Sequence, residues 1–416
     1  MRTLVRAGAG AGLVGFSISF CALFVAACAD DPSSSPGPGP FGSDAGTAED
    51  ARSGPDPFED AGTDSGPSSG DAGRDAARPA EGDWSPAAGF TGDVQSLAIS
   101  DLGSGTLPIV ALGSSGAQRS IDNGITWSAF NEGLTNPRGV SLGAIPGGTS
   151  LLASSERGAA DAGAPYVFAS TNGGAWSSRD ITVPAAGAVP NDAHDVHGWL
   201  VLGGAGQMGC GRNVATGGPD VLQGKMGGSK WKVNPILPPA TSQGACRALV
   251  GQANDNLYAT VFAPGSVGGV FQSTGGQAVD WSDVGAGIDP ADKPYTFALA
   301  MSRTQPKTLY VGIQRSGGGR VYKTVDGAVT WSRASEGIPE GDPVVSLAVH
   351  PTLPNVAYAG TRSGVYKTAD GGASWTLSHA SRGATVTALA VHHLDGTMVF
   401  AGMDAAPGLW ISRSGG

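Results

Sequence analysis

The stretch YKTADGGASW, residues Tyr366–Trp375, decides the fold because the chain repeats it. Close copies are SIDNGITW at Ser120–Trp127 and KTVDGAVTW at Lys323–Trp331, and more divergent copies end at Trp176, Trp231 and Trp281. From Trp127 to Trp375 the successive tryptophans of these copies are 49, 55, 50, 50 and 44 residues apart. A period of about 40–50 residues is typical of a propeller or a solenoid array.

The sequence around each copy is typical of β-strands. Between Val344 and His379 the runs VVSLAVHP, NVAYAGT, GVYKT and ASWTLSH are rich in β-branched and aromatic residues and are separated by turn residues. Four strands per repeat correspond to one blade of a β-propeller, which makes the predicted fold all-β. A two-sheet sandwich is the alternative, but it would not explain a tryptophan-bearing turn at a fixed period.

The two ends of the repeat region complete each other. The chain finishes with GLWISRSGG, residues Gly408–Gly416, and stops where the repeat should continue to its tryptophan. The missing part stands at GDWSPAAGF, residues Gly82–Phe90, and Trp84 then occupies the equivalent position. This pairing predicts a seven-bladed β-propeller whose last blade is closed by both chain ends, which removes exposed sheet edges. Six blades with frayed ends are the alternative.

Residues 1–27 are predicted to be a lipoprotein signal peptide. Arg2 and Arg6 precede an apolar run that ends in VAAC at Cys28, an order typical of a secretory signal. The small residues before Cys28 resemble the bacterial lipobox, which implies cleavage before this cysteine and lipid attachment to it. Ala29 rather than Asp follows the cysteine, so the resemblance favours the outer membrane. An ordinary signal peptide with an incidental cysteine is the alternative.

Residues 28–82 are predicted to form a disordered tether. Pro, Gly, Ser, Ala and Asp dominate this segment, which cannot bury enough apolar surface to offset the entropy of ordering. Twelve acidic residues and three arginines give it a net charge of −9, and two arginines of the signal peptide contribute +2. Because the whole chain carries −10, residues 83–416 carry −3. A nearly neutral domain offers no basic face for nucleic acid.

Two cysteines are predicted to form a disulfide. Of the four cysteines, Cys21 leaves with the signal peptide and Cys28 takes the lipid, which leaves Cys210 and Cys246. An exported domain lies in an oxidising compartment, where such a pair is expected to be oxidised. We expect Cys210 in the loop between the second and third strands of blade three and Cys246 at the start of blade four. Two buried free thiols are the alternative.

The repeated stretch resembles the Asp-box, also called the bacterial neuraminidase repeat, with the pattern Ser/Thr-x-Asp-x-Gly-x-Thr/Ser-Trp. The resemblance implies a turn between the third and fourth strands of each blade, on the face away from the central funnel. A short Asp and a Gly fix such a turn, and a Trp packs between blades, so we expect a structural role. The residues concerned are Trp84, Asp122, Gly124, Trp127, Trp176, Trp231, Trp281, Asp326, Trp331, Asp370, Gly372 and Trp375.

Candidate binding residues are expected on the opposite face, where the fourth strand of one blade leads to the next blade and the second strand leads to the third. The longest predicted connections are Glu156–Pro165 in blade two and Gln207–Asp220 in blade three, and long loops often carry binding groups. The stretch NDAHDVHGW, residues Asn191–Trp199, enters blade three on this face. The candidate binding residues are Arg157, His194, Asp195, His197, Arg212 and Arg247.

No metal site or cofactor is predicted. His194 and His197, with Asp192 and Asp195, are residue types that bind metals. On a strand, however, side chains three residues apart point to opposite faces of the sheet. The two histidines are therefore interpreted as surface residues beside a turn.

Enzymes share this kind of repeat. Sialidases use three arginines, a Tyr–Glu pair and an acidic Asp, and here Arg157, Arg212 and Arg247 could lie on the loop face without an evident Tyr–Glu pair. The stretch Leu347–Gly360 is similar to repeats of xyloglucan hydrolases, which place catalytic aspartates on two facing propellers. Propellers of the photosystem II assembly type have similar repeats as well.

The sequence therefore predicts a monomeric, non-enzymatic β-propeller that binds a protein or a glycan at the bacterial cell envelope. The lipid anchor would be its only contact with the membrane. A glycoside hydrolase of the exo-sialidase type is the alternative function.

Overall fold

The computed structural model describes residues 83–100, 108–144, 150–155, 167–179, 194–202, 206–213, 218–224, 231–238, 241–252, 255–276 and 278–416. The predicted signal peptide 1–27, the lipid attachment site Cys28 and the tether 28–82 lie outside these residues and stay predictions. Within the described part of the chain, no helix combines the length and the apolar character needed to cross a membrane.

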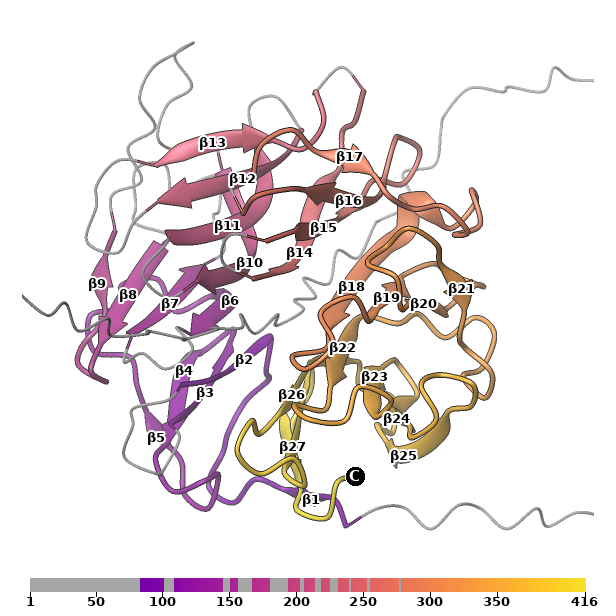
Figure 1. Cartoon of the computed structure of the whole chain (residues 1–416). Helices are drawn as coiled ribbons and strands as arrows, with labels where there is room; N and C mark the ends of the chain where they lie inside the picture. The colour runs from indigo at the N-terminus through magenta and orange to yellow at the C-terminus, as the bar shows by residue number, and fades with distance from the viewer. Residues whose placement is uncertain are drawn as a thin grey trace, which may run out of the picture. The chain divides into compact units, whose positions relative to one another are not determined.

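The described residues form seven antiparallel sheets of four strands, arranged as the blades of a ring (Figure 1). Blades one to three contain β2 (Ser96–Ile99), β3 (Ile109–Gly113), β4 (Gly116–Ser120) and β5 (Ser128–Ala129); β6 (Gly139–Ala144), β7 (Ser150–Ser155), β8 (Val167–Thr171) and β9 (Ser177–Ser178); β10 (His194–Leu202), β11 (Gly206–Asn213), β12 (Pro219–Gly224) and β13 (Lys232–Pro235). Blades four to six contain β14 (Ala245–Gly251), β15 (Leu257–Phe262), β16 (Gly269–Ser273) and β17 (Ser282–Asp283); β18 (Thr296–Met301), β19 (Leu309–Ile313), β20 (Arg320–Thr324) and β21 (Ser332–Arg333); β22 (Ser346–Val349), β23 (Ala357–Gly360), β24 (Gly364–Thr368) and β25 (Thr376–Ala380). A short 3-10 turn, η1 (Lys293–Tyr295), precedes β18.

The seventh blade is built from both ends of the repeat region, and the predicted closure is confirmed. Its strands are β26 (Val386–Val391), β27 (Val399–Met403), β28 (Leu409–Ser412) and, from the start of the domain, β1 (Ser85–Pro86). Ser85 pairs with Ile411 and Pro86 with Trp410. The indole nitrogen of Trp84 donates a 2.8 Å hydrogen bond to the Ser378 hydroxyl of blade six. The first residues of the domain thus connect the last two blades.

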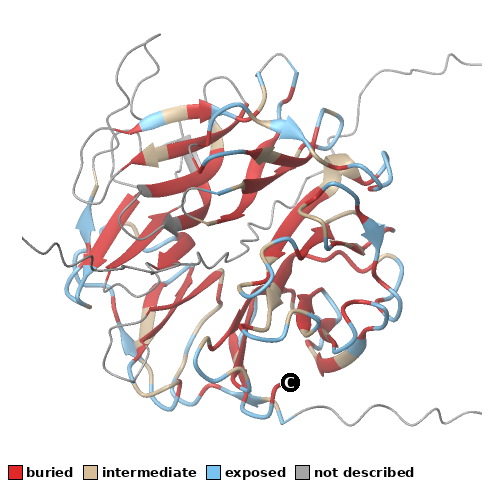
Figure 2. Cartoon of the chain, viewed as in Figure 1, coloured by how far each residue is buried: buried red, intermediate tan, exposed pale blue. Residues whose placement is uncertain are grey.

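The first strand of each blade lies at the centre of the ring and the fourth at its rim (Figure 1). The inner strands are buried, whereas the rim strands β5, β9, β17 and β21 are exposed (Figure 2). Leu249 of β14 packs in the core between blades three and four, and its neighbours Ala248 and Val250 pack between blades four and five. Alternate side chains of a strand point to opposite faces. The core is therefore a series of layers between blades.

One predicted loop is wrong. The stretch Gln207–Asp220 was expected to be a long connection, but most of it belongs to strands β11 and β12, and Cys210 lies within β11. The glycines of this stretch are typical of loops, yet one of them, Gly209, leaves room for the neighbouring Trp199 ring. A side-chain carbon at Gly209 would lie 3.2 Å from the Trp199 ring and 3.0 Å from Val196. A side chain at this position would crowd Trp199, which favours a glycine inside the strand.

Candidate functional site

The Asp-box residues form closed turns. In blade six the Asp370 carboxylate accepts hydrogen bonds from the Thr368 hydroxyl at 2.7 Å and from the backbone and hydroxyl of Ser374 at 2.9 and 2.6 Å. The same bonds hold Asp122 in blade one and Asp326 in blade five. The hydroxyl of Thr126 and that of Thr324 are the main causes that lower the pKa of Asp122 and Asp326, respectively, to about 2. These carboxylates are occupied within their own turns.

The tryptophans that end these turns connect adjacent blades. The indole nitrogens of Trp176, Trp331 and Trp375 donate to backbone carbonyls of the preceding blade at 2.7, 2.8 and 2.7 Å. All three rings are buried. Trp281 differs, because its indole nitrogen donates to Ala278 within its own turn. The tryptophans on this face of the ring therefore hold adjacent blades together.

The opposite face carries a set of bulged residues near the start of each inner strand. In five blades the register between the first two strands shifts by one at a single extra residue: Val140, His197, Arg247, Phe297 and Thr387. Gln95 and Val345 take the same position in blades one and six, where their N–H groups donate to Leu112 and Gly360. A β-bulge re-aims the side chain that it carries.

Arg247, the bulged residue of blade four, is held against two aromatic rings. Its guanidinium carbon lies 5.3 Å from the ring centre of Phe297 and 5.6 Å from that of Phe262 at the end of β15. Phe262 packs edge-on against both Phe297 and Tyr295. Arg247 is only 9% exposed. Aromatic faces attract a cation more strongly where water is excluded, so these rings hold a buried positive charge on the loop face.

His197, the bulged residue of blade three, is only 8% exposed, so its interpretation as a surface residue is wrong. It lies close enough to Arg247 to feel its charge. Burial is the main cause that lowers its pKa well below the usual value, and the positive charges of Arg247 and Arg212 act in the same direction. The imidazole is therefore neutral near pH 7. Its Nδ1 atom has no hydrogen-bond partner among the described residues. Burial of a polar atom without a hydrogen-bond partner costs free energy, and a ligand atom could form the missing hydrogen bond.

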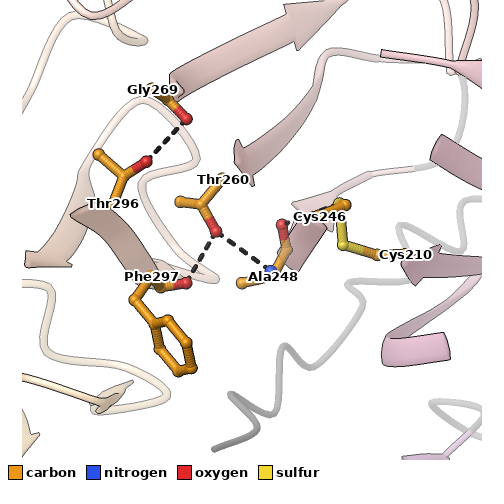
Figure 3. The surroundings of a disulfide bond; sticks show 7 residues. All are labelled: Cys210, Cys246, Ala248, Thr260, Gly269, Thr296 and Phe297. Carbon is orange, nitrogen blue, oxygen red and sulfur yellow. Dashed lines mark hydrogen bonds between the residues drawn. A yellow bond between two sulfur atoms is a disulfide. The ribbon is translucent and has the colours of Figure 1, made fainter. Parts of the chain in front are cut away.

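A disulfide and one hydroxyl group fix these bulges relative to one another (Figure 3). Cys210 and Cys246 are bonded, with Cα atoms 5.2 Å apart. Cys246 directly precedes Arg247, and Cys210 pairs across the sheet with Gly198, which directly follows His197. The Thr260 hydroxyl accepts from the Ala248 N–H at 3.1 Å and donates to the Phe297 carbonyl at 2.7 Å. Blades three, four and five are thereby connected beside the bulges.

A buried carboxylate next to this region is already neutralised. Asp292, in the turn before η1, has no exposed side-chain surface and accepts from Arg320 at 2.7 Å, Tyr322 at 2.8 Å and Arg315 at 3.3 Å. Arg315 also lies 5.5 Å from the ring centre of Tyr295. Asp292 therefore orders blade five and is not a free nucleophile or acid.

Of the six candidate binding residues, the structure places His197, Arg212 and Arg247 in one region. Arg157 lies outside the described residues, and nothing is described of the side chains of His194 and Asp195. Phe262 and Phe297 were missed, because aromatic residues in strands usually belong to the core. Tyr295, in η1, was not predicted as a binding residue either. In the described part of the chain, no group of His, Cys, Asp and Glu could hold a metal ion.

Comparison with known proteins identifies the fold. No protein-family model and no curated protein sequence matches the chain. Among solved structures, the GH74 xyloglucanase from Xanthomonas campestris matches with a TM-score of 0.57 and 15% identity, over 80% of this chain and 53% of the enzyme. YCF48 from Cyanidioschyzon merolae matches with a TM-score of 0.54 and 15% identity, over 79% of this chain and 98% of that chain. A YCF48 structure bound to D1 peptide is similar as well, with a TM-score of 0.53, 15% identity and coverage of 78% and 94%.

These similarities show a seven-bladed propeller and nothing finer. This chain spans about half the length of the matched xyloglucanase. The neighbours include both a glycoside hydrolase and a protein that binds a peptide. The function must therefore be argued from the residues of this chain.

Proposed function

We propose that this protein is a non-enzymatic binding module of the cell envelope, whose propeller takes a protein or glycan ligand with an anionic group on the face that carries Arg247. The observation behind the proposal is the buried guanidinium of Arg247 between Phe262 and Phe297, beside the neutral His197. A carboxylate, sulfate or phosphate would pair with Arg247 and could also bring a hydrogen bond to His197. The aromatic rings would contact the adjoining apolar part of the ligand.

A binding role fits the carboxylates better than catalysis does. Glycoside hydrolysis needs two carboxyl groups facing one substrate. Asp122, Asp326 and Asp370 are occupied in their turns, and Asp292 is neutralised by Arg315, Arg320 and Tyr322. The complex of YCF48 with D1 peptide shows that another propeller of this fold takes a peptide ligand, which supports a binding role by analogy.

The test uses the full-length protein in detergent with two arrays as probes: acidic and neutral peptides, and sialylated, uronic-acid and neutral glycans. We expect acidic members of one array to be retained, and Arg247→Met to weaken their binding by about tenfold or more, since a charged hydrogen bond is lost. Arg362→Met is the matched control, because Arg362 is exposed on the same face in blade six. Equal binding of neutral members, or equal losses in both variants, would contradict the proposal.

The rival function has its own test. Glycan hydrolysis by the purified protein that is abolished by Asp220→Asn would show an enzyme, because Asp220 is a buried carboxylate of β12, opposite Gly211 on β11. The proposed anchor is tested separately. Cys28→Ser should move the protein from the detergent phase to the aqueous phase, and unchanged partitioning would exclude lipid attachment at this residue.

A further inference from the structure

A cavity of about 330 Å³ lies on the other face of the ring, remote from Arg247. Its lining residues are Arg303, Thr304, Pro351, Thr352, His393 and Leu394. They come from the turns between the first and second strands of blades five, six and seven. Because strands alternate in direction, these turns share a face with the Asp-boxes.

The three turns have the same construction. Each contains seven residues, at 302–308, 350–356 and 392–398. The N–H of the first residue donates to the carbonyl of the seventh at 2.9–3.0 Å in all three turns: Ser302 to Thr308, His350 to Val356 and His392 to Met398. The cavity is lined by the second and third residues of each turn. The same two positions of each turn, occupied by different side chains, thus form the wall of the cavity.

The turns are held from inside, which makes the cavity pre-formed. The side chain of the first residue accepts a backbone N–H in each case: Ser302 from Gln305 at 3.1 Å, His350 from Leu353 at 3.1 Å and His392 from Asp395 at 3.0 Å. The Thr304 hydroxyl reaches the Thr352 carbonyl at 3.5 Å, so the turns of blades five and six also touch. Pre-formed pockets of about 300–1,000 Å³ are typical of small-ligand sites.

The lining residues define the chemistry of a ligand. Arg303 contributes a positive charge, the cavity wall contains no carboxylate among the described residues, and Thr304, Thr352 and His393 add polar groups. Pro351 and Leu394 form an apolar part, and Leu394 is 64% exposed. The positive charge of Arg303 would repel a cation, and an inorganic anion would leave the apolar part unused. We propose that this cavity binds a carboxylate with a small apolar substituent, either a free acid or the C-terminal residue of a peptide.

The test is calorimetry on the full-length protein with four probes. N-acetyl-leucine and hexanoate represent free acids, Ala-Ala-Leu represents a peptide C-terminus, and N-acetyl-leucinamide is the neutral counterpart. We expect saturable millimolar binding of an acid and a loss of about tenfold or more for the amide and for Arg303→Gln, because a charged hydrogen bond is removed. Preference for Ala-Ala-Leu over hexanoate would identify a peptide as the source, and the reverse would identify a free acid.

Matched variants separate this site from general charge effects and from the Arg247 face. Lys307→Gln removes one positive charge from the same turn outside the cavity, and Leu353→Ser changes an exposed leucine of the neighbouring turn. Both should bind the probes as the unchanged protein does, whereas Leu394→Ser should bind them more weakly. Arg303→Gln should cause the same loss in the Arg247→Met background, which separates the two faces, and Arg303→Lys should retain part of the binding. Equal binding of acid and amide, no saturable binding of either acid or Ala-Ala-Leu, or an equal effect of Lys307→Gln would overturn the proposal.

Discussion

Removal of the disulfide should weaken the fold and the Arg247 face together. Cys210 and Cys246 are fully buried in the core between blades three and four and are separated by 36 residues in sequence. In the chain-entropy model, a cross-link over this separation stabilises the folded state by about 3–4 kcal/mol. We therefore expect the double variant Cys210→Ala/Cys246→Ala to lose about this much free energy of unfolding, with a further contribution from the lost core contacts.

The assay is guanidinium unfolding followed by tryptophan fluorescence, with and without a reductant. The reduced unchanged protein keeps both side chains and isolates the cross-link, and the double variant should not respond to the reductant. Ligand binding at Arg247 should weaken in the same samples, because Cys246 precedes Arg247. Two titratable thiols from this pair in the unfolded, unreduced protein, or a double variant as stable as its parent, would refute the reasoning.

Three more predictions concern the ring. Deleting residues 1–87 removes β1 and Trp84 and should lower the melting temperature measurably, since about 1 kcal/mol corresponds to about 2–4 °C for a domain of about 150–250 residues and to less for this larger one. A melt like that of the parent would mean that β1 contributes nothing. Trp375→Phe should lower the free energy of unfolding in denaturant by about 1–3 kcal/mol, because the Ala334 carbonyl loses its donor. Trp127→Phe should lower it less, because the Trp127 indole nitrogen has no partner among the described residues. Burial lowers the pKa of His197, His350 and His392, so the folded state binds fewer protons than the unfolded state, and the unfolding free energy should fall as pH drops below about 6.5. Stability that does not change between neutral and mildly acidic pH would exclude this linkage.

The period of the repeat predicts the fold because it is a local signal. Each copy of the turn, such as Ser120–Trp127, contains its own hydrogen-bond donors and acceptors, so the copies can be recognised one by one and counted. The closing strand could be predicted for the same reason, since Trp84 completes a recognisable copy. Strand β11 could not be predicted, because Gly209 leaves room for the Trp199 ring, which a local pattern does not reveal.

The binding region depends on contacts between blades and is therefore harder to predict. His197, Arg212 and Arg247 are recognisable as polar residues near the loop face. Arg247 contacts Phe262 and Phe297 because β14, β15 and β18, from two blades, bring these residues together. The bulges re-aim the side chains of Arg247 and Phe297. A register shift of one residue has no signature in a single sequence. The aromatic residues of the site could therefore not be predicted from the sequence.

The disulfide lies between two blades whose repeats are degenerate. Blades three and four lack the box aspartate, and the Trp281 indole donates within its own turn instead of to blade three. The interface between these two blades is therefore without the tryptophan hydrogen bond that Trp331 and Trp375 make at theirs. The Cys210–Cys246 bond spans this same interface. A covalent link thus lies at an interface without this hydrogen bond, where the ring also has to hold the buried charge of Arg247, whose desolvation costs free energy that the rest of the fold must offset.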